Sequence, residues 1–226
     1  MSYVDSQKLQ RCYDAWRAVV AAKQGDLNQS ISFRSGVADA EEGYKYTILE
    51  KGKQILGQFD WSAPGLIGSS KIAQMVLDLL GICTSPGVQQ NLVDYRDVMY
   101  FADQAYSKRL ENIEKGLYLL FADGNDRDAF NILSQNLNMK YALISYFFFL
   151  KDSSKYQVVR PKNFAERFPM MGADPRCAMN CSWENYQRYV GVLEEVRCFL
   201  GERQTEDVTL TDAHSFVWMF WMLSNR

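Results

Sequence analysis

Four residues near the C-terminus are of the types that bind zinc. Cys177 and Cys181 form a C-x3-C pair, and Cys198 and His214 follow at wide spacings. Structural zinc sites usually take their cysteine and histidine ligands as two close pairs. No second close pair is present here, and Cys198 falls among the apolar residues of an expected helix. We therefore expect no metal site and no bound cofactor.

His214 is the only histidine of the chain. Counted from a helix cap at Thr211, it falls in the first turn, where the helix dipole disfavours a charged imidazole. Asp212 lies on another face of the same helix, so the two side chains form no ready-made catalytic pair. The sequence favours a neutral histidine bonded to a neighbouring backbone group or carboxylate. A catalytic or ligand role is the alternative.

Carboxylates and lysines lie close together in residues 39–56. A metal-dependent nuclease needs carboxylates that converge on a hard cation, usually with a lysine nearby. The stretches EEGYK and EKGK offer both, but at spacings common on any solvated helix face. No phosphate-binding loop or nucleophile elbow occurs, and we assign no catalytic residue. A nuclease with an unrecognised site remains an alternative function, and it would use Glu41, Glu42, Lys45, Glu50 or His214.

A basic segment, residues 151–167, is the leading candidate for a binding surface. Its five cations and two acids give a local net charge of +3, in a chain whose formal net charge is −2. Aromatic residues lie between the cations, and such a mixture can hold phosphates and stack on bases. The alternative is a solvated edge whose arginines pair with the acidic stretch 194–207. The candidate binding residues are Lys155, Tyr156, Arg160, Lys162 and Arg167.

Apolar residues recur with helical spacing along most of the chain. In residues 7–23 and 183–196 they follow the i, i+3, i+4, i+7 rule of a helix with one buried face. Ser182 is a suitable cap for the second of these helices. Further helices are expected over residues 37–56, 69–81, 88–124 (as two helices or one broken near Ser107), 125–136, 139–152 and 161–168.

The sole convincing strand is KYQVVRP, residues 155–161, which has no obvious partner. It can belong to a small hairpin or form an isolated extended segment, and Pro161 then suits the first turn of a helix. The predicted fold class is mainly α: a compact multi-helix domain with at most a small β element near residues 155–160. We expect one domain over residues 1–226, with a soft subdivision into 1–150 and 151–226.

The C-terminal stretch FVWMFWML carries large apolar side chains on every face of a helix. Such a helix must be buried or docked on a partner. Trp218 and Trp221 are the candidate partner contacts. If they dock on another chain, the protein would be a structural subunit of a homo- or hetero-oligomer.

The composition is that of a folded protein. Hydrophobic residues make up 47% of the 226, and 5 Pro and 14 Gly argue against disorder. The longest apolar runs have about 8 to 10 residues, whereas a membrane span needs roughly 20. The N-terminus has no apolar signal segment, and an odd count of five cysteines favours reduced thiols. We expect a cytoplasmic protein that does not bind membranes.

Several stretches together resemble a group of poorly characterised bacterial proteins associated with restriction or phage-defence systems. They are EEGYKYTILEKGKQIL, IGSSKIAQMVL, FFFLKDSSKYQVVRPKNFAERF, SWENYQRYV and LTDAHSFVWMF. The resemblance covers most of the chain, implies association with DNA or a protein complex, and transfers no catalytic residue. The expected function is a non-catalytic module that binds nucleic acid or a protein partner in bacterial phage defence or counter-defence.

Overall fold

The structure, a computed structural model, describes residues 2–25, 32–84, 90–204 and 206–224, and for 221–224 the backbone alone. The described residues are mainly α-helical, as the sequence predicts. The first helices are α1 (Ser6–Gln24), α2 (Gly36–Glu42), α3 (Tyr44–Gln58), α4 (Lys71–Thr84), α5 (Tyr95–Gln104) and α6 (Leu110–Tyr118). The others are α7 (Asp126–Asn136), α8 (Tyr141–Lys151), α9 (Pro161–Arg167), α10 (Arg176–Met179), α11 (Trp183–Gly201) and α12 (Leu210–Ser224). A π-helical turn (Leu119–Asp123) extends α6, and a 3-10 turn (Phe168–Met171) extends α9.

Side-chain caps define several helix starts. The Ser182 side chain accepts a hydrogen bond from the Asn185 N–H, which confirms the predicted cap of α11. The predicted cap at Thr211 is wrong, because α12 already begins at Leu210. Thr209 takes that place: its hydroxyl accepts from the Asp212 N–H, and the Asp212 carboxylate accepts from the Thr209 N–H at 2.8 Å. The two residues satisfy each other's free donors as a capping box.

The helix predicted over residues 37–56 is two helices, α2 and α3, that meet at Gly43. The backbone is too tight there for a side chain, since a Cβ on Gly43 would lie 2.6 Å from the Asp39 carbonyl oxygen. The predicted break near Ser107 is confirmed, because α5 ends at Gln104 and α6 begins at Leu110. Apolar periodicity located these helices, but it did not show the turn between two short ones.

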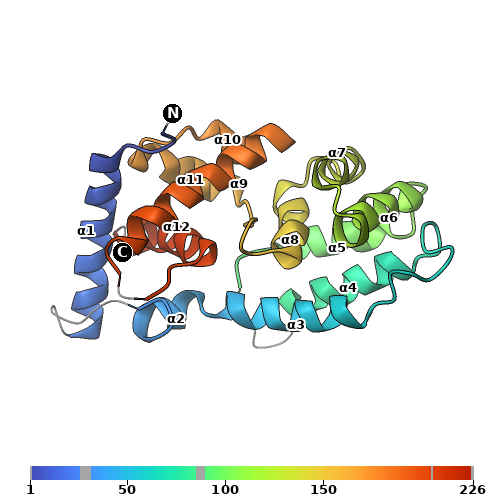
Figure 1. The fold of residues 1–226 in the computed structure, drawn as a ribbon, viewed down its shortest axis with the longest axis horizontal. Coiled ribbons are helices and arrows are strands. Elements are labelled where there is room, and N and C mark those ends of the chain that lie inside the picture. Colours follow the sequence, from blue (N-terminus) through green and yellow to red (C-terminus); the bar gives the residue numbers. More distant parts are fainter. Residues whose placement is uncertain (1, 26–31, 85–89, 205, 225–226) are drawn as a thin grey trace.

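The helices pack around one hydrophobic core that extends through the molecule. At one end, α1 lies beside α12, which also contacts α9 and α11, while α6 and α7 pack together at the other end (Figure 1). Helix α1 thus packs more extensively with α12 than with α2, its neighbour in the sequence. Helix α8 is central, and each of its residues from Tyr141 to Leu150 is buried. None of the described helices is long and apolar enough to span a membrane.

The segment predicted as a strand is extended but unpaired, and no strand occurs within the described residues. Residues 156–159 are buried, so their backbone groups need partners inside the protein. Side chains of three helices supply them. Val159 N–H donates to Ser145 Oγ at 2.8 Å, the Gln157 carbonyl accepts from Tyr186 Oη at 3.1 Å, and the Val158 carbonyl accepts from Tyr189 Oη at 2.8 Å and from the His214 ring at 2.9 Å.

Candidate functional site

His214 is a fully buried side chain of α12 that supports the extended segment. A carbonyl oxygen can only accept, so Nε2 must donate to the Val158 carbonyl, which leaves Nδ1 as an acceptor. The Lys45 ammonium lies 2.7 Å from Nδ1 and donates to it. Burial lowers the pKa of His214 well below its usual value, and the charge of Lys45 lowers it further. The imidazole is therefore neutral, as the sequence analysis favoured.

Lys45 is the centre of what we call the buried polar cluster: Glu42, Lys45, His214 and Ser215. Its ammonium pairs with the Glu42 carboxylate, donates to His214 Nδ1, and donates to Ser215 Oγ at 3.0 Å. Three acceptors thus match its three donors. Burial lowers the pKa of Lys45 and raises that of Glu42, and the opposite charge of each partner counteracts both shifts. The cluster joins α2 and α3 to α12.

Three of the residues considered for a nuclease therefore do meet, but inside the protein. Glu42, Lys45 and His214 are at most 4% exposed. Glu50 is exposed on α3, and Glu41 contacts Lys23 of α1. Within the part of the chain that the structure describes, no three His, Cys, Asp or Glu side chains are grouped so that they could hold a metal ion.

The four zinc-ligand candidates are not brought together either. His214 is engaged by Val158 and Lys45, whereas Cys198 is exposed on α11. The Cys177 thiol donates to the Asp174 carbonyl at 2.9 Å. Burial raises the pKa of both Cys177 and Cys181 to about 12, so each is a protonated thiol at neutral pH and a poor nucleophile.

The basic segment of the sequence is divided among three environments. Tyr156 is buried, and its hydroxyl donates to Asp126 at 2.6 Å. Arg167 is also buried, with its guanidinium 4.2 Å from the ring centre of Trp218. Lys155 is exposed and pairs with Asp152 at 3.2 Å. Of the five candidates, Arg160 and Lys162 are the two that share one surface.

The proposed partner helix is part of the core. Residues 210–217, 219 and 220 of α12 are buried by the chain itself, mainly against α1, α9 and α11. Trp218 is partly buried and carries Arg167 on its ring. The side chain of Trp221 lies outside the described residues.

Arg160 and Lys162 line a hollow of about 380 Å³ between α5, the start of α8 and the start of α9. Arg96 and Lys140 line the same hollow, so cations from three distant segments of the sequence meet there. We call this set of four cations, together with Asp94 and Asp97, the basic hollow. The Arg160 guanidinium donates to the Leu92 carbonyl at 3.4 Å, and Arg96 is 88% exposed.

Both acids of the basic hollow have structural partners. Asp94 caps α5 by accepting from the Arg96 N–H at 2.9 Å. That bond lowers the pKa of Asp94, and the charges of Arg96 and Arg160 lower it further. Asp97 pairs with Lys140 at 2.8 Å. Four cations against two engaged acids leave the hollow with a net charge of +2, suited to an anionic ligand.

Sequence reasoning missed Arg96 and Lys140. Each lies outside the basic segment, Arg96 in the first turn of α5 and Lys140 directly before α8. Neither position carries a local signal for binding, because Arg96 lies between two acids and Lys140 is a single cation among uncharged residues. The cations become one group when the tertiary structure brings the starts of α5, α8 and α9 to the same hollow.

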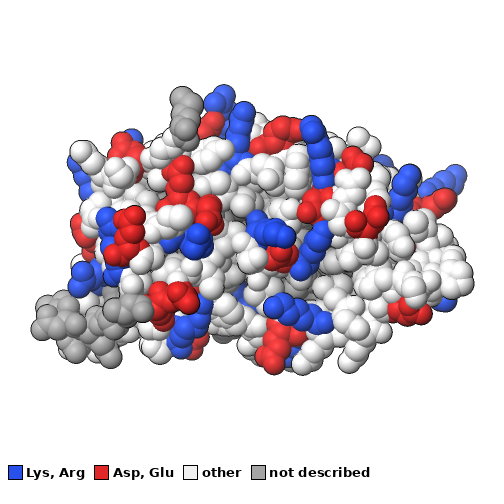
Figure 2. All heavy atoms as spheres, viewed as in Figure 1, with Lys and Arg blue, Asp and Glu red and all other residues white. Residues whose placement is uncertain are grey.

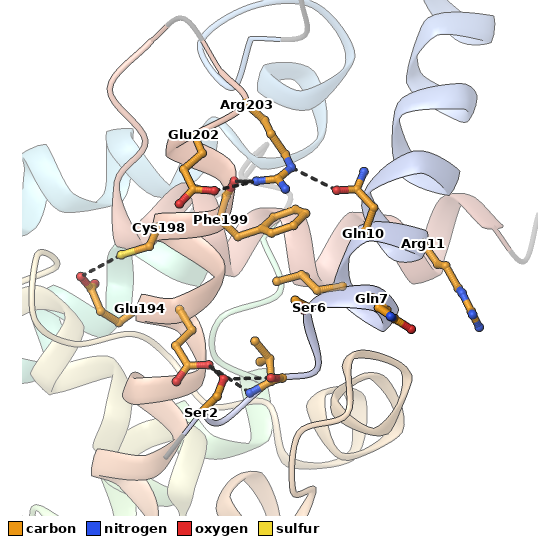
Figure 3. Close-up of a pocket in the computed structure, with 13 residues that line it drawn as sticks. Ser2, Ser6, Gln7, Gln10, Arg11, Glu194, Cys198, Phe199, Glu202 and Arg203 are labelled. Carbon is orange, nitrogen blue, oxygen red and sulfur yellow. Dashed lines mark hydrogen bonds and ion pairs between the residues drawn. The ribbon is translucent and has the colours of Figure 1, made fainter.

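A larger groove of about 810 Å³ lies between the N-terminal residues and the C-terminal half of α11 (Figure 3). Hydrogen bonds cross the groove: the Glu195 carboxylate accepts from the Tyr3 N–H at 2.8 Å. Arg203 lies 3.6 Å from the ring centre of Phe199, donates to Gln10 at 3.2 Å and pairs with Glu202 at 3.1 Å. Arg11 points away from Arg203 in the same view. This arrangement fastens the N-terminus to α11 and does not gather charge for a ligand.

Comparison with known proteins adds no relative: no family model, no curated protein and no solved structure matches this chain. The functional argument therefore rests on the residues of the basic hollow.

Proposed function

We propose that this protein is a non-catalytic binding module whose basic hollow holds the phosphate backbone of a nucleic acid. The observation that carries the proposal is the meeting of Arg96, Lys140, Arg160 and Lys162 in one hollow. Lys and Arg supply many of the contacts that proteins make to phosphates, and these contacts bind without reading the base sequence.

The charge distribution supports a local site. On the face shown in Figure 2, Lys and Arg side chains alternate with Asp and Glu. The chain has a formal net charge of −2, so it does not attract nucleic acid as a whole. A nucleic acid would therefore need a local excess of cations, and the basic hollow supplies one from partly exposed side chains.

The proposal includes the setting that the sequence resemblance implies, a bacterial phage-defence or counter-defence system in the cytoplasm. A module that holds the backbone without reading bases would fix a defence complex to its nucleic-acid target. Recognition or cleavage would then belong to another component of that complex.

The test is a fluorescence binding titration with labelled DNA and RNA over a range of salt concentrations, with and without magnesium. Wild type should bind in a saturable manner, and its affinity should fall steeply with salt because binding releases counterions. The double variant Arg160→Ala with Lys162→Ala should bind more weakly. Its slope of log affinity against log salt should be smaller by about 1.4 to 1.8, the effect of two lost phosphate contacts.

The matched control is Lys51→Ala with Lys53→Ala, which removes two exposed cations of α3 that do not line the hollow. This variant should keep the wild-type affinity and slope. Equal losses in both double variants would show a diffuse charge effect and sink the assignment of the hollow. Magnesium-dependent cleavage, read on a gel after the titration, would overturn the non-catalytic assignment in favour of a nuclease. Absence of binding at every salt concentration would leave a protein partner as the ligand.

A further inference from the structure

The solvent face of α5 beside the basic hollow carries exposed apolar side chains that the phosphate proposal does not use. Tyr95 is 64% exposed, Met99 46% and, just after the helix, Tyr106 84%. Met139, in the turn before α8, is 53% exposed. These are four of the eight large apolar side chains that are strongly exposed within the described residues. Most other large apolar side chains of the protein are buried. The position of these four on or near α5 therefore indicates a contact surface.

The two tyrosines are spaced to lie on one side of α5. Residues 95, 99 and 106 follow an i, i+4, i+11 pattern, which returns to the same face at 3.6 residues per turn. Ala105 keeps helical backbone angles beyond the last residue of the helix. At 1.5 Å per residue, the backbone advances about 16 Å along the helix axis from Tyr95 to Tyr106. Stacked nucleotides rise about 3.4 Å each, so this distance corresponds to roughly five of them.

Cations lie at both ends of this face. Arg96 follows Tyr95 and belongs to the basic hollow. Lys108 and Arg109, both exposed, follow Tyr106. Arg109, directly before α6, donates to the Asn138 side chain at 2.9 Å, which holds the turn between α5 and α6 against the turn that contains Met139. Asp103 is exposed between the two rings, so phosphates would be contacted at the ends of the face, beside the rings, and not in its middle.

From this arrangement we infer that the nucleic acid is a single strand whose bases stack on Tyr95 and Tyr106 while its phosphates contact the basic hollow. The inference rests on the proposed function and adds the class of nucleic acid. In a duplex the bases are paired and stacked on one another, so exposed rings would meet only its backbone. In a single strand every base offers a face to an aromatic ring, and alternating rings and cations are the usual means of binding it.

The test measures the binding of a labelled oligothymidylate of about ten nucleotides and of a duplex of the same length. Four proteins are compared: wild type, Tyr95→Ala with Tyr106→Ala, Tyr95→Phe with Tyr106→Phe, and Arg160→Ala with Lys162→Ala. Wild type should prefer the single strand. The alanine variant should lose at least about fivefold in affinity for each ring removed. The phenylalanine variant keeps both rings and should bind as wild type.

Salt dependence separates the two kinds of contact. Removal of the rings should weaken binding with the salt slope unchanged, whereas removal of Arg160 and Lys162 should reduce the slope. Both tyrosines are exposed, so circular dichroism and the melting temperature should show an intact fold in each variant. Equal or tighter binding of the duplex, or wild-type affinity in the alanine variant, would overturn the single-strand inference and leave the phosphate proposal standing. Absence of binding by wild type would overturn both.

Discussion

The buried polar cluster and the basic hollow contain similar side chains in opposite surroundings. In the cluster, Lys45 is fully buried and each of its donors has an acceptor within the chain. In the hollow, Arg96 is 88% exposed and Lys162 is exposed beside it. A charge removed from water must be satisfied by the protein itself, whereas a solvated charge can still exchange water for a ligand. Similar side chains thus specify the fold in one place and offer a binding surface in the other.

The comparison also shows how misleading a set of reactive residue types can be. A carboxylate, a lysine and a histidine meet within hydrogen-bonding distance around Lys45, which is a composition typical of active sites. Their partners are one another, the Ser215 hydroxyl and the backbone of Val158. The two regions differ in whether solvent reaches their side chains, and not in the types of those side chains.

The largest effect is expected from Lys45→Met, which keeps the volume and removes the charge. Glu42 would be left buried without its cation, and breaking such a pair costs about 3–5 kcal/mol of unfolding free energy. Urea denaturation measures the loss. The control Lys51→Met, at an exposed site of the same helix, should change stability by no more than about 0.5 kcal/mol. If the two variants are equally stable, Lys45 is not the buried centre that we describe.

The second prediction concerns pH and His214. Its pKa is near 6.5 in the unfolded chain and well below that in the folded protein. Below about pH 6.5 the unfolded chain therefore binds a proton that the folded protein does not, so the stability of the folded state falls as the pH decreases. Between pH 7 and pH 5.5 wild type should lose about 1 kcal/mol more than His214→Gln. Because the chain has one histidine, an equal loss in both proteins would contradict the buried neutral imidazole.

The third prediction is that the net positive charge of the basic hollow can be removed at little cost to the stability of the fold. Arg160→Ala with Lys162→Ala should change the unfolding free energy by about 1 kcal/mol or less, because partly exposed cations contribute little to stability. The same variant should lose affinity for nucleic acid. Thermal unfolding and the binding titration, run on one preparation, check both parts. A loss as large as that of Lys45→Met would mean that the hollow belongs to the core.

The smallest effect is expected from Lys155→Ala. Lys155 belongs to the same basic segment as Arg160, but it is exposed, pairs with Asp152 in its own turn and does not line the hollow. Stability should remain within about 0.5 kcal/mol of wild type, and affinity for nucleic acid should be unchanged. If Lys155→Ala loses as much affinity for nucleic acid as Arg160→Ala with Lys162→Ala, the binding surface extends along the basic segment beyond the hollow.

The sequence by itself determined the local structure. Helix formation depends on bonds between residues four apart and on caps beside the helix ends, so periodicity located α1 and α11 and Ser182 marked the start of α11. The same reasoning predicted a neutral His214. The sequence prediction placed the cap of α12 two residues too late, because Thr209 and Thr211 both carry a hydroxyl that suits a cap. It also merged α2 with α3, because the tight turn at Gly43 leaves the apolar pattern unbroken.

The tertiary structure decided which side chains meet and which remain in water. Lys45 reaches His214 across 169 positions of the sequence, and Arg96 comes to line the same hollow as Arg160. Among the described residues the extended segment 156–160 pairs with no strand, and tyrosines of α11 and the imidazole of α12 bind its carbonyls instead. Such contacts depend on how whole helices pack, and the free energy of a charge depends on the solvent left around it. A short stretch of residues specifies neither the packing of helices nor the solvent around a charge. The basic hollow therefore exists as a site only in the folded protein.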